Sequence, residues 1–175
     1  MVLVILLLLV ALLFLHHKGI FNMPYLDRVP LPFLSEQTTG GGSDLGNLKI
    51  KTSNVNSRFM NSEKAGRLFV VTGTVKNEYS DPRSHIKVSG SLYTRDKTLA
   101  DTATAYCGNV IADLELTQMT PAAIRTRLGN QSGDNNTNEN VKAGEERPFM
   151  VIFFELPESL DEFTVTVLES SAASK

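Results

Sequence analysis

Residues 68 to 75 read Leu-Phe-Val-Val-Thr-Gly-Thr-Val, and this stretch decides the fold class. Odd-numbered positions from Phe69 to Val75 share one face and even-numbered positions the other, because side chains alternate along a strand. β-branched and aromatic residues dominate the stretch, and such residues favour strands over helices. The pattern predicts a β-strand that directs one face into a hydrophobic core.

Four further segments carry strand signals. Apolar residues alternate with polar ones over residues 86–92, 99–107 and 163–167. Residues 149–156 are apolar on both faces, which predicts a central strand whose second side is covered by a helix or another sheet. Short strands without a βαβ rhythm predict a mainly β protein, an immunoglobulin-like antiparallel β-sandwich.

One short helix is expected within this β domain. Thr120 supplies a cap, Pro121 suits the first helical turn, and Gly129 supplies a stop. Residues 130–140 are almost wholly polar and predict a loop. Two connections stay open for the strands near residues 70 and 90: a direct hairpin with Gly73 opposite Gly90, or a crossing to the other sheet.

The N-terminal region carries the most apolar segment. Val2 to Leu15 is a run of fourteen apolar residues, which as a helix spans roughly 21 Å, whereas a bilayer core is about 30 Å thick. The short span and the absence of a preceding basic flank predict the end of a membrane helix that starts before Met1. A signal peptide and a buried core helix are the alternatives, and a lipoprotein is disfavoured because no cysteine follows the run.

Composition changes divide the chain into four parts. We predict a membrane anchor at 1–18, a Pro/Gly-rich linker at 19–47, a β-sandwich domain at 48–170 and a disordered tail at 171–175. The linker is apolar enough in its first half to lie on the bilayer or against the domain. Lys18 and Arg28 follow the span, which alone would place the domain in the cytoplasm, but this count loses its meaning if residues precede Met1.

Charge and cysteine content exclude several classes of function. Seventeen Lys and Arg against nineteen Asp and Glu give a net charge of -2, without the basic stripe that nucleic-acid binding needs. The single cysteine, Cys107, excludes an internal disulfide and a cysteine-based zinc site within this chain. We therefore expect no nucleic-acid partner.

A polar segment imitates the ligand spacing of a calcium loop. The candidate ligands are Asp134, Asn136, Asn138 and Glu145, but Glu139 stands where such a loop needs glycine. No helices are expected to flank the segment, so a solvated loop explains these residues better than a metal site.

Cys107 and His85 are the candidates for a thiol enzyme, since a cysteine nucleophile needs a nearby base. Cys107 is in phase with Leu99, Ala103 and Ala105, however, which is typical of a small core residue. We therefore predict no catalytic residue and no cofactor.

Several motifs together resemble a known family. They read FVVTGTVKN at 69–77, IKVSGSLYT at 86–94, AYCGNV at 105–110, AGEERPFMVIFFELP at 143–157 and FTVTVLES at 163–170, with the expected helix at Pro121 between them. Their order resembles a bacterial family of unknown function that joins a cytoplasmic zinc ribbon, one membrane helix and a C-terminal immunoglobulin-like domain. GTVKN followed by GSLYT is also similar to FxLYD-type sandwich domains.

The resemblance covers about residues 66–170 and implies an immunoglobulin-like domain outside the cytoplasm. It brings no catalytic residues, and the zinc ribbon is absent from this sequence. Together with the anchor and linker, it leads to the hypothesis of a membrane-anchored, periplasmic, non-enzymatic interaction or assembly module with a protein partner. The alternatives are a calcium-dependent binding module and a thiol-dependent enzyme using Cys107.

Overall fold

The computed structural model describes residues 44–173 of the chain. The predicted anchor at 1–18 and most of the predicted linker lie outside the described residues. Within the described part, no helix has both the length and the apolar character needed to cross a bilayer.

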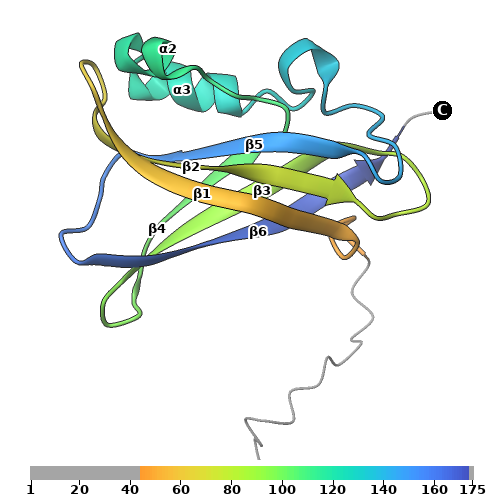
Figure 1. The fold of residues 1–175 in the computed structure, drawn as a ribbon, viewed down its shortest axis with the longest axis horizontal. Coiled ribbons are helices and arrows are strands. Elements are labelled where there is room, and N and C mark those ends of the chain that lie inside the picture. The colour runs from red at the N-terminus through yellow and green to blue at the C-terminus, as the bar shows by residue number, and fades with distance from the viewer. Residues whose placement is uncertain (1–43, 174–175) are drawn as a thin grey trace, which may run out of the picture. The chain divides into compact units, whose positions relative to one another are not determined.

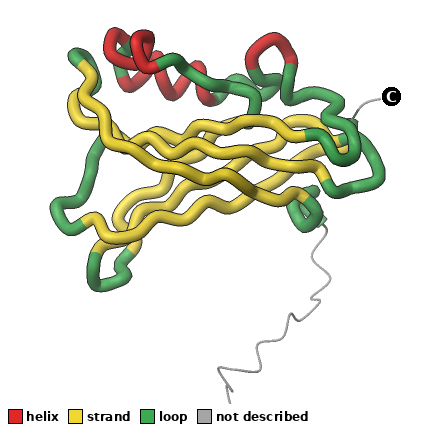
Figure 2. The backbone as a smooth tube through the Cα atoms, in the orientation of Figure 1, coloured by secondary structure: helices red, strands yellow, loops and turns green. Residues whose placement is uncertain are grey.

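Two three-stranded antiparallel sheets form the body of the domain (Figures 1 and 2). Sheet A has the order β1-β2-β5 and sheet B the order β4-β3-β6. The strand bounds are β1 Ile50–Ser62, β2 Gly66–Asn77, β3 Arg83–Thr94, β4 Leu99–Tyr106, β5 Glu146–Phe153 and β6 Leu160–Ala172. The predicted two-layer antiparallel β-sandwich is therefore confirmed.

The chain crosses from sheet A to sheet B between β2 and β3. Gly73 in β2 pairs with Phe149 of β5, not with Gly90, so the direct hairpin is excluded. Both glycines make room for phenyl rings. A Cβ on Gly73 would lie 2.6 Å from Cζ of Phe149, and one on Gly90 would lie 2.9 Å from Cζ of Phe153.

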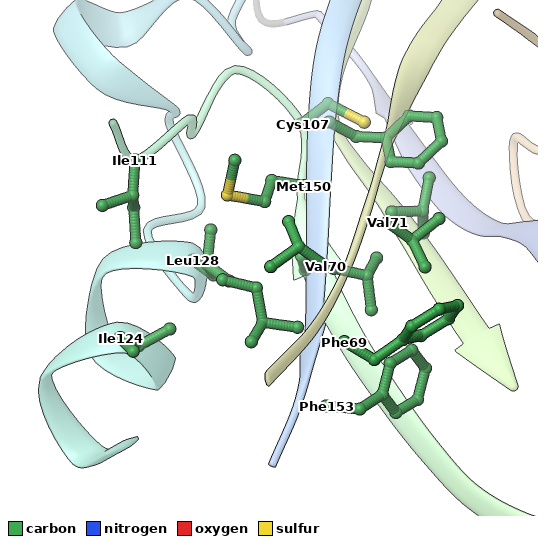
Figure 3. Packing of buried hydrophobic residues seen from close by; sticks show 14 of the residues in the cluster. Phe69, Val70, Val71, Cys107, Ile111, Ile124, Leu128, Met150 and Phe153 are labelled. Atoms are coloured by element: carbon green, nitrogen blue, oxygen red, sulfur yellow. The ribbon is translucent and has the colours of Figure 1, made fainter. Parts of the chain in front are cut away.

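Strand β5 lies at the end of sheet A, so the prediction of a central strand was wrong. Its two apolar faces have a different cause, because sheet A is covered on both sides. Figure 3 shows Met150 on the side of Ile124 and Leu128, and Phe153 on the opposite side. All four side chains are buried in the core. Helices thus cover one face of sheet A, and sheet B covers the other.

Between residues 110 and 129, the structure has two α-helices where one was predicted, α2 at Asp113–Gln118 and α3 at Pro121–Leu128. A 3-10 turn, η2, follows at Asp134–Asn136. In α3 the predicted start is confirmed, because the Thr120 hydroxyl accepts a hydrogen bond from Ala123 N at 3.3 Å. Helix α2 has no side-chain cap and buries only Leu116. Its six residues therefore lack the signals by which sequence reasoning finds a helix.

Two elements extend beyond the segments that the sequence identified. Strand β1 was not singled out, because its middle part, Lys51 to Ser57, is polar and exposed at the edge of sheet A. Strand β6 continues to Ala172, past the predicted domain end at 170. The Ser171 hydroxyl donates a hydrogen bond to Ser84 O at 3.1 Å, which holds this last part of β6 on β3.

A polar junction holds residues 44–46 against the β-sandwich. The Tyr79 hydroxyl donates to both carboxylate oxygens of Asp44, at 2.9 and 2.7 Å. The Arg83 guanidinium lies 4.8 Å from the centre of the Tyr79 ring. Arg83 also donates to Ser170 Oγ at 2.9 Å, and Ser170 N donates to Leu45 O. The start of the domain is thus joined to β6.

This junction predicts an acid-sensitive contribution to stability. The hydrogen bond from Tyr79 lowers the pKa of Asp44, with backbone N–H groups such as that of Gly46 adding to the effect. A lowered pKa in the folded state means that the junction stabilises the fold above the ordinary carboxyl pKa, and that this contribution is lost as the pH falls through the lowered value. In Tyr79→Phe, we expect an NMR titration to show the Asp44 pKa closer to its ordinary value. An unchanged Asp44 pKa would show that the hydroxyl does not hold the carboxylate.

Candidate functional site

Cys107 lies in the core and not at a reactive surface. Its side chain is fully buried, and Figure 3 shows it near the hydrophobic side chains Met150 and Val71 of sheet A. Burial raises the pKa of the Cys107 thiol, which disfavours the nucleophilic thiolate. The expectation that Cys107 is a small core residue agrees with this position.

His85 lies near Cys107 along the backbone, but its ring has another partner. Cys107 N donates to Ile86 O, so the two segments are adjacent on β3 and the end of β4. The His85 Nδ1 atom lies 3.2 Å from the Ser171 hydroxyl. The His85 ring thus faces Ser171, and among the described residues no hydrogen bond joins it to the Cys107 thiol.

Three of the four candidate calcium ligands, Asp134, Asn138 and Glu145, have protein partners. Asp134 Oδ1 accepts from Arg127 Nε at 2.8 Å, and Glu145 accepts from both Lys142 N and Arg147 Nη2. The Lys142 N–H is the main cause that lowers the pKa of Glu145, and Arg147 adds to it. The Asn136 side chain is exposed on η2. Across residues 44–173, no three His, Cys, Asp or Glu side chains converge as a metal site would require.

Asn138 has a structural role that the sequence did not indicate. Its side chain is fully buried and pairs with a backbone peptide of β3. Asn138 Oδ1 accepts from Ile86 N at 3.1 Å, while Nδ2 donates to Ile86 O at 3.1 Å and to Gln131 O at 3.0 Å. The Asn138 amide thus makes the two backbone hydrogen bonds to Ile86 that a neighbouring strand would otherwise make. These bonds hold the loop at 130–140 against sheet B.

Three of the four outer strands have a feature that interrupts or covers part of the free edge. A register shift between Ser53 and Asn56 interrupts β1, where Asn54 adopts a left-handed conformation with φ of 52°. The segment at 45–47 covers the end of β6 through bonds to Val167 and Ser170. Strand β5 is linked to the end of β4 by the hydrogen bond from Gly108 N to Pro148 O, of 2.7 Å.

Strand β4 retains an open edge within the described residues. Cys107 N donates to Ile86 O, so every second residue back along β4, including Ala105 and Ala103, directs its backbone groups to β3. The backbone groups of Thr104 and Thr102 then point away from the sheet. In agreement, Thr102 N donates to the Asp101 carboxylate at 2.7 Å and not to a strand.

A groove runs along this open edge. It has a volume of about 330 Å³ and lies between residues 101–104 of β4, helix α3 and the end of β5. Its lining includes the buried side chains of Ile124, Leu128 and Ile152. The partly exposed residues Ala103 and Phe154 form the apolar floor that a ligand can reach. We call this feature the β4 groove, and Figure 1 shows the elements that form it. An open strand edge beside an apolar floor is a geometry that binds extended peptides.

Charged side chains border one end of the β4 groove. An adjoining hollow of about 230 Å³ is lined by Ala100, Asp101, Arg125, Phe154 and Glu155. Arg125 lies over the Phe154 ring, 4.5 Å from the ring centre. Neither Asp101 nor Glu155 forms an ion pair with any side chain in the described part of the chain.

A larger groove, of about 510 Å³, lies where the β1–β2 turn meets the β5–β6 connection. Phe59, Leu156 and Leu160 line it, and the Arg67 guanidinium lies 4.5 Å from the Phe59 ring centre. Its walls come mainly from the turn and the connecting loop, and no described strand lines it with four consecutive residues, as β4 lines the other groove. The β4 groove is therefore the better candidate for a binding site. Sequence reasoning missed it because residues from three distant segments form it.

Fold and groove define the class of protein as an antiparallel β-sandwich module with a helical cover on one sheet and an open strand edge. The chain belongs to the family described as Protein of unknown function (DUF3426), whose model matches residues 50–167. The expected resemblance to a family of unknown function is confirmed at this level, and the match also includes β1. Neither the curated proteins nor the solved structures contain a match to the chain.

Proposed function

We propose that this protein is a non-enzymatic interaction or assembly module of the cell envelope that binds a protein partner in the β4 groove. The single observation that carries the proposal is the open backbone edge at Thr102 and Thr104 beside the apolar floor formed by the partly exposed residues Ala103 and Phe154. Backbone groups there offer hydrogen bonds, and the floor offers apolar burial.

The proposed setting is the outer side of the cytoplasmic membrane. The apolar run Val2 to Leu15 supports a membrane anchor, and the resemblance to proteins with one membrane helix and an immunoglobulin-like or FxLYD-type domain supports a periplasmic location for the sandwich. For relatives that carry a zinc ribbon, the same proposal places that ribbon on the cytoplasmic side of the membrane. A tethered module meets membrane-bound partners at a raised effective concentration.

Photo-crosslinking in intact cells tests this function. A photoreactive amino acid at Thr102 of the full-length chain is expected to yield a reproducible adduct with one partner protein in the membrane fraction. Thr52 is the matched control, since it is an exposed threonine on β1, an outer strand of the other sheet. The proposal is wrong if Thr102 yields no partner, if Thr52 yields the same partner, or if the full-length chain remains in the soluble fraction.

A further inference from the structure

The shape of the β4 groove restricts the conformation of its ligand. Backbone groups of Thr102 and Thr104 face the open side, and they are spaced for an added strand because outward groups recur at every second residue. Helix α3 forms the facing wall through Ile124 and Leu128. A ligand that uses both features is an extended peptide lying along β4.

The lining of the groove restricts the side chains of that peptide. Next to residues 101–104, the floor is apolar, because Ala103 and Phe154 are partly exposed there. The adjoining hollow, next to Ala100, carries the carboxylates of Asp101 and Glu155. Residues of an extended chain that share a face are about 6.6 Å apart, so one ligand residue can lie over the floor and the next over the carboxylates.

Charge decides which side chain suits the hollow. Two carboxylates face one guanidinium there, and Arg125 already lies against the Phe154 ring. Within the described residues, the only hydrogen bond of the Asp101 side chain comes from the N–H of Thr102, an outward group that an incoming strand would take over. A basic side chain in the ligand would neutralise the carboxylate that is released.

We infer that the β4 groove binds an extended protein segment by strand addition, and that this segment carries an apolar residue followed or preceded, two positions away, by Lys or Arg. This inference rests on the proposed function and names the chemistry of the partner. Main-chain hydrogen bonds to β4 provide affinity, while the apolar floor and the two carboxylates provide specificity. When no ligand is present, the Asp101 carboxylate occupies the outward N–H of Thr102, which disfavours unspecific pairing at this position.

Peptide selection on the full-length chain in lipid nanodiscs tests the inference. The probe is a phage-displayed library of random seven-residue peptides, and we expect enrichment of sequences with an apolar residue two positions from Lys or Arg. A selected peptide is expected to bind Thr104→Pro about tenfold more weakly, because proline removes an outward N–H and obstructs the edge. The melting temperature of Thr104→Pro shows whether the sandwich is intact.

Glu155→Lys provides a second test that leaves the strand backbone unchanged. Glu155 is exposed, and its charge reversal is expected to change the enriched side chain from basic to acidic. Glu146→Lys, an exposed change on β5 outside the groove, is the matched control and should select the original sequences. The inference is overturned if no apolar and basic pair is enriched, if Glu155→Lys selects unchanged sequences, or if folded Thr104→Pro binds normally. A Thr102 adduct with a partner that lacks such a segment would leave the proposed function in place and reject the strand-addition mode.

Discussion

Replacing Asn138 by alanine is expected to lower the free energy of unfolding by about 2–4 kcal/mol. The Asn138 amide makes three hydrogen bonds to backbone groups in a fully buried position. Ile86 O keeps the bond from Cys107 N, but Ile86 N loses its partner and remains buried. A buried N–H without a partner costs about 1–3 kcal/mol, and the lost packing adds to this cost.

Chemical denaturation of the full-length chain in detergent, followed by circular dichroism, measures this effect. Asn136→Gly is the matched control, because Asn136 lies on the same loop, is exposed, and has a left-handed φ of 60° that glycine tolerates. We expect this control to stay within about 0.5 kcal/mol of the original protein. If Asn138→Ala were as stable as the control, the loop would not be fastened by this amide.

Replacing Phe149 by alanine is expected to cost about 3–5 kcal/mol of folding free energy. Phe149 is fully buried between the sheets, and its ring occupies the space above Gly73. Since neither Gly73 nor the surrounding strands can move a side chain into that space, the substitution leaves a cavity. The measurement is the same denaturation experiment, with the transition expected at a much lower denaturant concentration.

Phe59→Ala is the matched control for this core substitution. Phe59 also lies on sheet A, but half of its side chain is exposed, and its main contact is the Phe69 ring at 4.9 Å. We expect a loss of about 1 kcal/mol for this variant. Equal losses for Phe149→Ala and Phe59→Ala would contradict the position of the core described for this sandwich.

The strands and the sheet architecture were predictable where apolar and polar residues alternate. Such alternation around Val88 reflects one buried face, which local sequence records directly. Helix α3 was also predictable, because Thr120 and Pro121 act locally at its start. The edge position of β5 in sheet A was not predictable from the sequence. A strand that is buried on both faces has the same apolar pattern whether a sheet or a helix covers its second face.

The candidate site was harder to predict than the fold. Asp134 and Asn138 occur at calcium-loop spacing, but spacing does not show that Arg127 and the Ile86 peptide are their partners. The β4 groove depends on α3 lying beside β4, a tertiary contact that no local pattern records. Asp101 is a polar residue in a strand, and only the structure shows that its carboxylate accepts the outward N–H of Thr102.

Amide hydrogen exchange along β4 tests the central claim most directly, which is that this strand edge is open and accepts a partner. In the isolated full-length chain, we predict rapid exchange at Thr102 and Thr104 and slow exchange at Ala103 and Ala105, and we predict that the crosslinked partner slows the two threonine amides. Equal protection of all four amides in the isolated chain, or threonine amides that exchange unchanged when the partner is bound, would contradict the account.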